Sequence, residues 1–314
     1  MSQITEFLFP SSAGNCHIHC VQWLPDQEPY VGVVQLVHGI AEHIKRYDDF
    51  ARFLNRHGYV VVGHDHLGHG TSVGSEADRG HFADCDGWTH AGNDIRTLQI
   101  MTARQFPGLP YFLFGHSMGS FLTRTHLIRF PGTITGAILC GTGQMSPVVI
   151  RAGRVAAHLE AKRLGLRGKS QLLKKLSFGS YNKKFEPVRT DVDWLSLDHR
   201  NVDNYINDPL CGFDTTVGLF LDLMDGLALI RDPKKLTQMD QKLPVFFIAG
   251  DQDPVGDFGK GVKKVYQSFQ RAGLSDLSLH LYPGLRHEIL NETNHETIYG
   301  DVLHWLETHR GAAV

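Results

Sequence analysis

The sequence predicts an α/β fold, a mostly parallel eight-stranded sheet flanked by helices, with a helical cap inserted after strand six. From the third candidate strand onward, short runs rich in Val, Ile, Leu and Phe lack polar alternation, as buried parallel strands do. Helix-like periodic segments separate most of these runs. About 100 residues separate strands six and seven, although a parallel crossover needs only about a dozen or more. We therefore assign residues 1–142 and 230–314 to the core and residues 143–229 to the inserted cap.

The candidate strands follow from these apolar runs. The first two are joined only by a short polar segment, Ser11–Asn15, so they form a hairpin and one of them must be antiparallel to the rest. The expected strands are Thr5–Phe9, His17–Trp23, Val33–Val37, Tyr59–Gly63, Tyr111–Phe114, Ala137–Cys140, Val245–Ala249 and Ser278–Leu281.

The composition narrows the class of protein. With 314 residues, 42% hydrophobic and 20% charged, the chain has the balance of a globular protein. A net charge of -2 offers no general attraction for nucleic acid. No run approaches the ~18 apolar residues of a membrane span, and the first residues lack the features of a signal peptide. The cysteines show no metal-ligand spacing, so we expect reduced thiols in a cytoplasm. They are Cys16, Cys20, Cys85, Cys140 and Cys211.

A serine between two glycines follows the fifth strand, in the stretch Gly115-His116-Ser117-Met118-Gly119. This pattern between a buried strand and a helix is the nucleophile elbow, a turn so tight that only glycines fit at its flanks. The turn lifts the Ser117 hydroxyl above the sheet and points the Met118 N–H toward a developing oxyanion. An ordinary glycine-rich turn is disfavoured because both the strand and the helix that the motif requires are present. We predict that Ser117 is the nucleophile and Met118 an oxyanion donor.

A serine needs a base to become a strong nucleophile. In proteins with this elbow, the acid and then the histidine follow the serine along the chain, and His287 lies just after strand eight. His280 lies within that strand and His295 on the following helix, so we expect structural or surface roles for both. We predict His287 as the base.

Two carboxylates compete for the acid position after strand seven. Asp251 lies closer to the strand end and is placed to cap the turn. Asp253 lies farther into the loop, which the fixed φ of Pro254 holds rigid. We favour Asp253 as the acid that orients His287.

The loop after strand three normally supplies the second oxyanion donor. Here Gly39 lets the backbone turn close to the elbow, and the next residue, Ile40, carries the candidate N–H. We expect Arg46 and Tyr47 to anchor this loop rather than to act chemically.

These segments together carry a family resemblance. The stretches HGIAEHIKRY, HDHLGHGTS, FGHSMGS, GDQDPVG and RHEILNE, spread from His38 to Glu292, resemble the monoacylglycerol lipase and lysophospholipase branch of the α/β-hydrolases, in the group that holds serine aminopeptidases. The resemblance implies the α/β-hydrolase fold and ester hydrolysis of single-chain acyl lipids, without a cofactor. It also implies a triad of Ser117, Asp253 and His287 and an oxyanion hole of Ile40 and Met118.

The cap contains a candidate substrate-binding stripe. Phe213, Val217, Phe220, Leu221 and Met224 recur at helical spacing, which predicts one apolar helical face. A face that lines an acyl channel and a face that packs on the core have the same pattern, so both interpretations stay open.

Three histidines lie close together after the fourth strand. His64 and His66 share a strand face next to His69, but the glycines that follow favour loop packing, so we predict no metal site.

The cap also contains a basic stretch with an apolar stripe. Val148, Ala152, Val155 and Leu159 recur at helical spacing among basic residues, Arg151, Arg154, Lys162 and Arg163. Such a helix is compatible with transient docking on an anionic lipid surface, but we prefer a solvated helix packed on the core.

The leading hypothesis, which follows the resemblance, is a cytoplasmic serine carboxylester hydrolase that acts on a small-molecule acyl ester, a monoacylglycerol or a lysophospholipid, with no nucleic-acid partner. An aminopeptidase or small-ester esterase with the same triad is the alternative, and an aminopeptidase would need cap carboxylates such as Asp191, Asp193 or Asp222 for the substrate amine. A non-catalytic binding module on a hydrolase scaffold is a third hypothesis, although no triad residue is missing.

Overall fold

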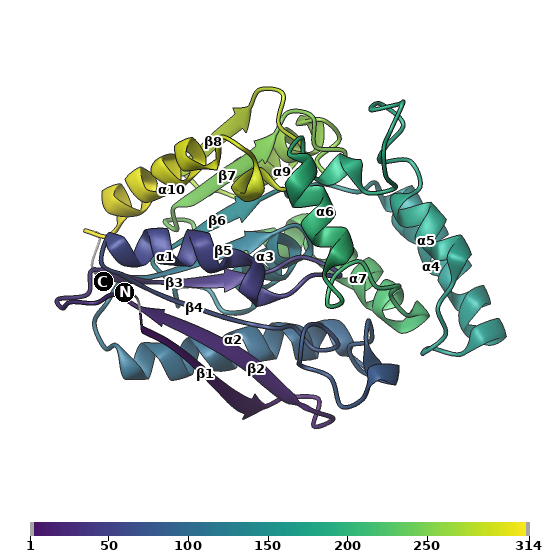
Figure 1. Ribbon diagram of the computed structural model, residues 1–314, viewed down its shortest axis with the longest axis horizontal. Helices are drawn as coiled ribbons and strands as arrows, with labels where there is room; N and C mark the ends of the chain where they lie inside the picture. The colour runs from purple at the N-terminus through teal and green to yellow at the C-terminus, as the bar shows by residue number, and fades with distance from the viewer. Residues whose placement is uncertain (1–2, 312–314) are drawn as a thin grey trace.

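The computed structural model describes residues 3–311, and its centre is one eight-stranded sheet (Figure 1). The strand order is β1-β2-β4-β3-β5-β6-β7-β8. Strands β3 to β8 are parallel, and β2 is antiparallel to both of its neighbours. The strands are β1 (Gln3–Pro10), β2 (His17–Leu24), β3 (Gly32–Val37), β4 (Tyr59–His64), β5 (Tyr111–His116), β6 (Gly136–Cys140), β7 (Val245–Gly250) and β8 (Leu277–Tyr282). Each lies where the sequence predicts it, and the N-terminal hairpin supplies the antiparallel strand.

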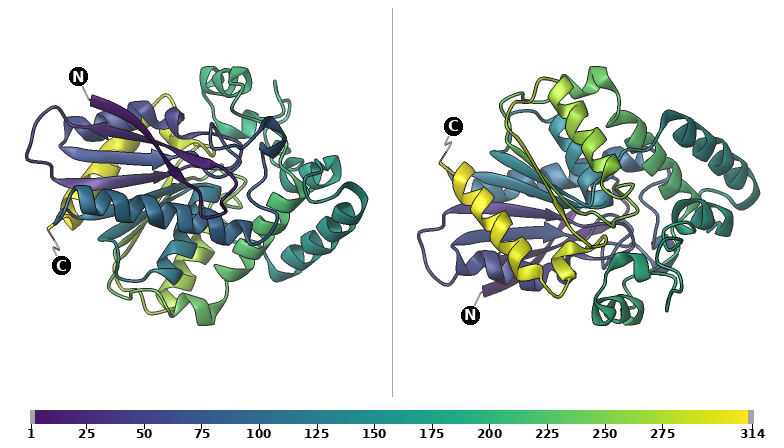
Figure 2. Two further views of the ribbon diagram at one scale, coloured as in Figure 1. Left: turned by 90° about the horizontal axis from the view of Figure 1, so that it is seen from below. Right: turned by 90° about the horizontal axis from the view of Figure 1, so that it is seen from above.

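Helices cover both faces of the sheet, and each face has its own apolar core (Figure 2). One face is covered by α1 (Asp48–Arg56) and α10 (His295–His309). The other is covered by α2 (Gly87–Gln105), α3 (Met118–Arg129) and α9 (Lys260–Arg271). Every residue of β3, β4, β5 and β7 is buried, which explains why these strands lack alternation. The α/β fold predicted from the sequence is therefore confirmed.

The segment between β6 and β7 is helical and lies at one end of the sheet, on the right in Figure 1. It contains α4 (Pro147–Leu164), α5 (Gln171–Phe178), α6 (His199–Asn207), α7 (Val217–Leu229), α8 (Pro233–Leu236) and the short 3-10 helix η3 (Asp193–Leu195). The other 3-10 helices are η1 (Ile44–Tyr47), η2 (Glu76–Asp78) and η4 (Ile289–Asn291). Because the parallel strands end on this side, the inserted helices lie over the loops that follow β3, β5, β7 and β8.

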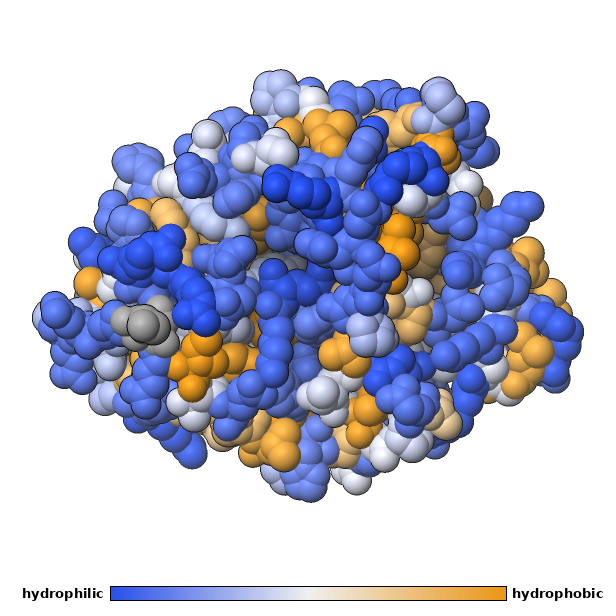
Figure 3. Space-filling view, viewed as in Figure 1, coloured by the Kyte–Doolittle hydropathy of each residue, from blue (hydrophilic) through white to orange (hydrophobic). Residues whose placement is uncertain are grey.

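The basic helix is solvated and packed, but not through its predicted apolar stripe. On α4 the predicted stripe faces solvent: Val148 is 71% exposed, and Val155 and Leu159 are each 62% exposed. The helix instead packs through the face that carries Ile150 and Ala157. Figure 3 shows apolar side chains at the right-hand end of the molecule, where α4 and α5 lie in Figure 1. The stripe had the correct helical period, but the period does not say which face meets the core.

The predicted apolar stripe of the cap also needs correction. Helix α7 begins at Val217, because the Thr216 side chain caps it by accepting a hydrogen bond from the Leu219 N–H at 3.2 Å. Phe213 therefore lies in the preceding loop and does not share a helical face with Phe220. Within residues 3–311, no helix is both long and apolar enough to span a membrane.

Candidate active site

The turn after β5 is held by contacts that leave no room for side chains at its glycines. A Cβ on Gly119 would lie 2.0 Å from the Val37 carbonyl oxygen, and a Cβ on Gly115 would lie 2.5 Å from the Gly119 carbonyl oxygen. Both distances are far inside van der Waals contact, so only glycine fits at either position. The turn thus packs directly against the end of β3.

Ser117 has a backbone conformation that non-glycine residues rarely adopt, with φ +53°. Such a conformation costs roughly 1–3 kcal/mol and persists only where the surroundings impose it. Here the Ser117 N–H donates to the Cys140 carbonyl at 3.0 Å, and its carbonyl accepts from the Ser120 hydroxyl at 2.6 Å. The strain places Ser117 between the strand and the first residue of α3, which is the geometry of a nucleophile elbow.

The loops after β7 and β8 bring a histidine and a carboxylate together. His287 Nδ1 lies 2.9 Å from Asp253 Oδ2, and both side chains are buried. The other oxygen of Asp253 accepts the Val255 N–H at 2.8 Å, which fixes the carboxylate. Asp251 does not contact His287; its Oδ1 accepts the Gly284 N–H at 2.8 Å instead. Because Nδ1 donates to Asp253, the other ring nitrogen, Nε2, is left to accept a proton.

Two aromatic rings position His287. The His116 ring lies 4.7 Å from the His287 ring, centroid to centroid, and the Trp194 ring lies 5.1 Å away. His116 belongs to the elbow, whereas Trp194 comes from η3 in the inserted segment. The sequence analysis did not identify these two residues. The imidazole is thus held by the core on one side and by the insertion on the other.

The electrostatic surroundings favour the protonated form of His287. Burial alone would lower its pKa, but the charge and hydrogen bond of Asp253, with further contributions from Glu288 and Glu42, outweigh burial and raise it. His116 shows the opposite result, because burial and the neighbouring His287 lower its pKa to about 4. His116 is therefore neutral near neutral pH, whereas the carboxylates around His287 increase the proton affinity of that ring.

The loop after β3 approaches Ser117 through Gly39. A Cβ on Gly39 would lie 3.1 Å from Ser117 Cβ and 2.7 Å from Glu42 Oε1. The Gly39 N–H donates to Glu42 Oε1 at 2.5 Å, and Tyr47 donates to the same oxygen at 2.9 Å. The loop is thereby fixed in a conformation that brings Ile40 next to the elbow.

A buried cation joins this loop to the loop that carries His287. Arg46 donates to Glu42 at 2.8 Å and to both oxygens of Glu288 at 2.7 Å. Burial would raise the pKa of Glu288, but Arg46 outweighs it and lowers this pKa to about 2. As expected, Arg46 and Tyr47 hold the loop through Glu42. The sequence offered no sign that Glu288 is their partner.

A cavity of about 550 Å³ opens above Ser117. Ser117, His287, Ile40 and Met118 all line it. The N–H of Met118 belongs to the first turn of α3, where helical amides have no carbonyl partner within the helix. Such a volume is typical of small-molecule sites. The four predicted residues thus line the same cavity.

The predicted cap residues divide into two groups. Phe213, Phe220 and Met224 line the cavity. Leu221 does not; it is partly buried against the core. One residue turns a helix by about 100°, so Leu221 points away from the direction of Phe220. Further apolar lining comes from Val148 and Ala152 of the basic helix and from residues that the sequence analysis did not single out, including Phe178, Leu223 and Leu227.

Hydrogen bonds hold His66 of the histidine cluster after β4 to the β3 loop, whereas His64 Nδ1 and His69 Nε2 are buried without a hydrogen-bond partner in the part of the chain that the structure describes. The His66 N–H donates to His38 Nε2 at 2.9 Å, and His66 Nε2 contacts the His38 carbonyl at 2.9 Å. Burial holds the pKa of both rings well below the usual value, so they are neutral. These rings pack the β3 and β4 loops together.

The match to a known family agrees with this geometry. The model of the family described as serine aminopeptidase, S33, matches residues 28–294. This chain belongs to the serine aminopeptidase S33 family. The matched range includes the elbow, the β3 loop, the inserted helices and the loop that carries His287.

Relatives of this S33 protein include named lipases. It is 30% identical to the monoacylglycerol lipase of Mycolicibacterium smegmatis, over 91% of each chain. It is 29% identical to the human monoglyceride lipase, over 91% of this chain and 86% of the other. Among solved structures, a thermostable carboxyl esterase from Bacillus coagulans superposes with a TM-score of 0.91 at 29% identity, covering 98% of this chain and 99% of the other. The resemblance inferred from the sequence is confirmed.

Proposed function

We propose that this protein hydrolyses the carboxylic ester of single-chain acyl lipids, with monoacylglycerols as the first candidate substrates. The enzyme is a carboxylester hydrolase, as its family and its similarity to monoacylglycerol lipases support. The observation that carries the proposal is that His287, paired with Asp253, and Ser117 line one cavity whose walls are largely apolar. An acyl chain is the substrate part that such walls would bind.

The proposed reaction proceeds through an acyl-enzyme. Ser117 Oγ attacks the ester carbonyl while His287 Nε2 takes its proton, and Asp253 stabilises the imidazolium through Nδ1–H. The N–H groups of Met118 and Ile40 stabilise the oxyanion. His287 then protonates the leaving alcohol, and a water that it deprotonates releases the fatty acid.

We propose that residues 143–229 form a cap that binds the acyl chain. Phe220, Met224 and Leu227 on α7 and Phe178 on α5 supply apolar walls, and Trp194 contacts His287 directly. Each buried methylene contributes about 0.8 kcal/mol, so a wall of this kind favours long chains over short ones.

The acidic residues around the cavity argue against an aminopeptidase. Those that line it, Glu42, Asp214 and Glu288, are each paired with a cation, namely Arg46 or Lys174. The three carboxylates considered for holding a substrate amine, Asp191, Asp193 and Asp222, do not line the cavity. Asp193 accepts the Arg189 N–H at 2.7 Å. A paired carboxylate gives a substrate ammonium group little net attraction.

We also propose that the mouth of the cavity meets lipid through α4 and α5. Val148, Val149 and Leu176 are exposed and also line the cavity, so the apolar surface continues from the interior to the outside. Basic residues of the same helices, such as Arg151 and Lys175, would favour an anionic surface. A lipid taken from an aggregate could then enter without crossing water.

A substrate panel tests the proposal. Initial rates are measured on monoacylglycerols, lysophospholipids, short p-nitrophenyl esters and aminoacyl amides, with Ser117→Ala as the blank. We expect the highest kcat/KM on long-chain monoacylglycerol. Faster hydrolysis of aminoacyl amides than of any ester would refute the assignment as an ester hydrolase. If a lysophospholipid were the best substrate, ester hydrolysis would stand and only the proposed head group would be wrong. Covalent labelling of Ser117 without turnover of any substrate would support the non-catalytic alternative.

A further inference from the structure

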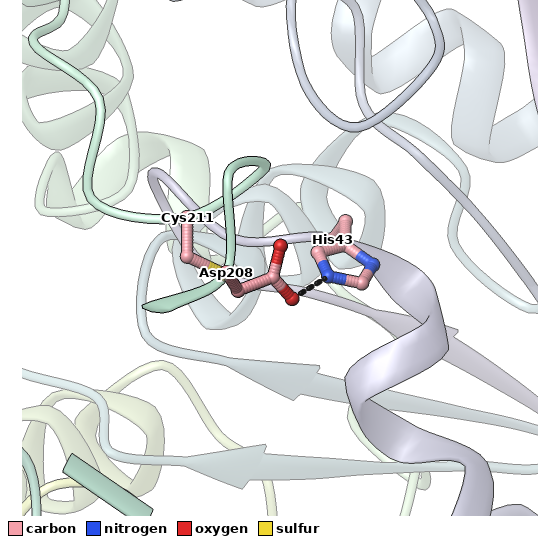
Figure 4. Close-up of side chains that lie close together, drawn as sticks. All are labelled: His43, Asp208 and Cys211. Carbon is pink, nitrogen blue, oxygen red and sulfur yellow. Dashed lines mark hydrogen bonds and ion pairs between the residues drawn. The ribbon is translucent and has the colours of Figure 1, made fainter. Parts of the chain in front are cut away.

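We infer that His43, Asp208 and Cys211 form a binding site for a borderline-soft divalent metal ion, with Zn²⁺ as the best match. Their potential ligand atoms all lie within 4.8 Å of one another. His43 Nε2 and Asp208 Oδ2 are 2.8 Å apart. Figure 4 shows the imidazole and the carboxylate joined by this contact, with Cys211 beside them on the same loop as Asp208.

The three residues come from opposite parts of the chain. His43 lies in the loop between β3 and η1, whereas Asp208 and Cys211 lie between α6 and α7. None of them is among the residues that line the cavity above Ser117. The site is therefore separate from the ester-hydrolysing centre, and it joins the inserted segment to the core.

The donor set selects the kind of ion. One imidazole nitrogen, one thiolate sulfur and one carboxylate oxygen are the ligand types that proteins offer to Zn²⁺. Mg²⁺ and Ca²⁺ prefer oxygen ligands throughout, so the imidazole and the thiol disfavour them. Three protein ligands leave a fourth tetrahedral position for water.

Surrounding contacts hold the ligands in place. Asp208 Oδ1 accepts the Leu210 N–H at 2.8 Å, which leaves Oδ2 directed at His43. The backbone on either side is tied together, because the Gly212 N–H donates to the Ala41 carbonyl at 2.9 Å. Such secondary contacts orient ligands and strengthen metal binding.

The charges near the site permit a cation. Arg46 is the nearby positive group, and it is neutralised by Glu42 and Glu288 in direct ion pairs. Asp208 is partly exposed, with 30% of its side chain accessible, whereas the His43 side chain is 9% accessible. An ion can therefore enter from solvent past the carboxylate and reach ligands that are otherwise buried.

Binding is balanced by the release of one proton. The Cys211 thiol loses its proton to solvent as the metal–sulfur bond forms. An imidazole that binds a metal through Nε2 keeps its one ring proton on Nδ1, so His43 contributes no further proton. No oxidation or reduction takes place.

Cobalt gives a direct test on the intact protein. Chelator-treated enzyme is titrated with Co²⁺, whose thiolate complexes absorb in the near ultraviolet, and Zn²⁺ is then added to displace it. We expect one equivalent of Co²⁺ to bind with a thiolate band, and Zn²⁺ to abolish that band. Cys211→Ser should remove the thiolate band and weaken Co²⁺ binding at least tenfold. Asp208→Asn should weaken Co²⁺ binding by a similar factor. Cys85→Ser is the matched control, because Cys85 is an exposed free thiol elsewhere in the chain.

The outcome does not depend on the variants folding. Zinc-edge X-ray absorption on the unmodified protein should show one sulfur at about 2.3 Å and nitrogen or oxygen ligands at about 2.0–2.2 Å. A shell without sulfur, a thiolate band that survives in folded Cys211→Ser, or a band lost in Cys85→Ser would each overturn the proposal. The absence of any Co²⁺ or Zn²⁺ binding up to about 100-fold molar excess would overturn it as well.

Discussion

The guanidinium of Arg46 holds Glu288, the residue after His287, through two hydrogen bonds of 2.7 Å each. Arg46 also donates to Glu42, which fixes the Gly39 N–H in the loop after β3. Two carboxylates therefore share one cation, and the network keeps a net negative charge beneath His287. This charge contributes to the raised pKa of His287 and connects the proposed base to the proposed oxyanion loop.

The raised pKa predicts where activity is lost in acid. Imidazolium cannot accept the Ser117 proton, so kcat/KM should fall as the pH drops through the pKa of His287. Because the pKa of His287 is raised, the midpoint should lie above ~6.5, the value of an unperturbed histidine. A profile of kcat/KM from pH 5 to 9 measures it. A flat profile down to about pH 5 would count against a histidine base.

Removing the Glu288 charge should move that midpoint. Glu288→Gln takes away one of the negative charges that raise the pKa of His287, so the acid limb should shift to lower pH. Glu296→Gln, at an exposed position on α10, is the matched control and should leave the profile unchanged. An unchanged midpoint in folded Glu288→Gln would show that the network is only structural.

Ser117 should be the residue that carries the acyl group. Ser117→Ala should lower turnover by roughly four to six orders of magnitude, because the covalent route disappears. Labelling of the unmodified enzyme with a fluorophosphonate, followed by peptide mass spectrometry, should locate the adduct at Ser117. The control variant Ser120→Ala, changed three residues farther along the chain, should still be labelled at Ser117. An adduct on any other serine would refute the assignment.

The two carboxylates after β7 should differ sharply in effect. Asp253→Asn should lower kcat about 10³- to 10⁴-fold, because His287 loses the partner that sets its tautomer. Asp251→Asn should leave kcat within a few-fold and cost at most about 1 kcal/mol of unfolding free energy, since its contact is with the Gly284 N–H. Steady-state kinetics and urea denaturation compare the pair. The opposite order would make Asp251 the acid.

Neighbouring residues on α7 offer a test of the acyl channel. Phe220 lines the cavity and Leu221 does not. Phe220→Ala should lower kcat/KM for an ester of about sixteen carbons by about tenfold more than for one of about eight, if the wall contacts two methylenes of the longer chain. Leu221→Ala should affect both esters equally. Equal losses in Phe220→Ala, together with a lowered Tm, would show that the side chain serves stability alone.

Much of the core could be predicted because its signals are local. Each parallel strand is a continuous apolar run, and the glycines at 115 and 119 are dictated by a turn that excludes any Cβ. The position of Ser117, the choice of His287 and the length of the insertion all depend on spacing along the chain, which the sequence displays directly. The family resemblance adds to these signals because its motifs lie in the same loops.

Contacts between distant segments were decided only by the tertiary structure. Trp194 lies against His287 across 93 positions of sequence, and His43 meets Asp208 across 165. Nothing in the residues themselves indicates such pairings, since the energy of a contact depends on which surfaces the fold brings together. The same holds for α4 and α7. Their apolar period was visible in the sequence, but whether a stripe faces solvent, core or cavity depends on the packing of the whole chain, because all three environments select the same period.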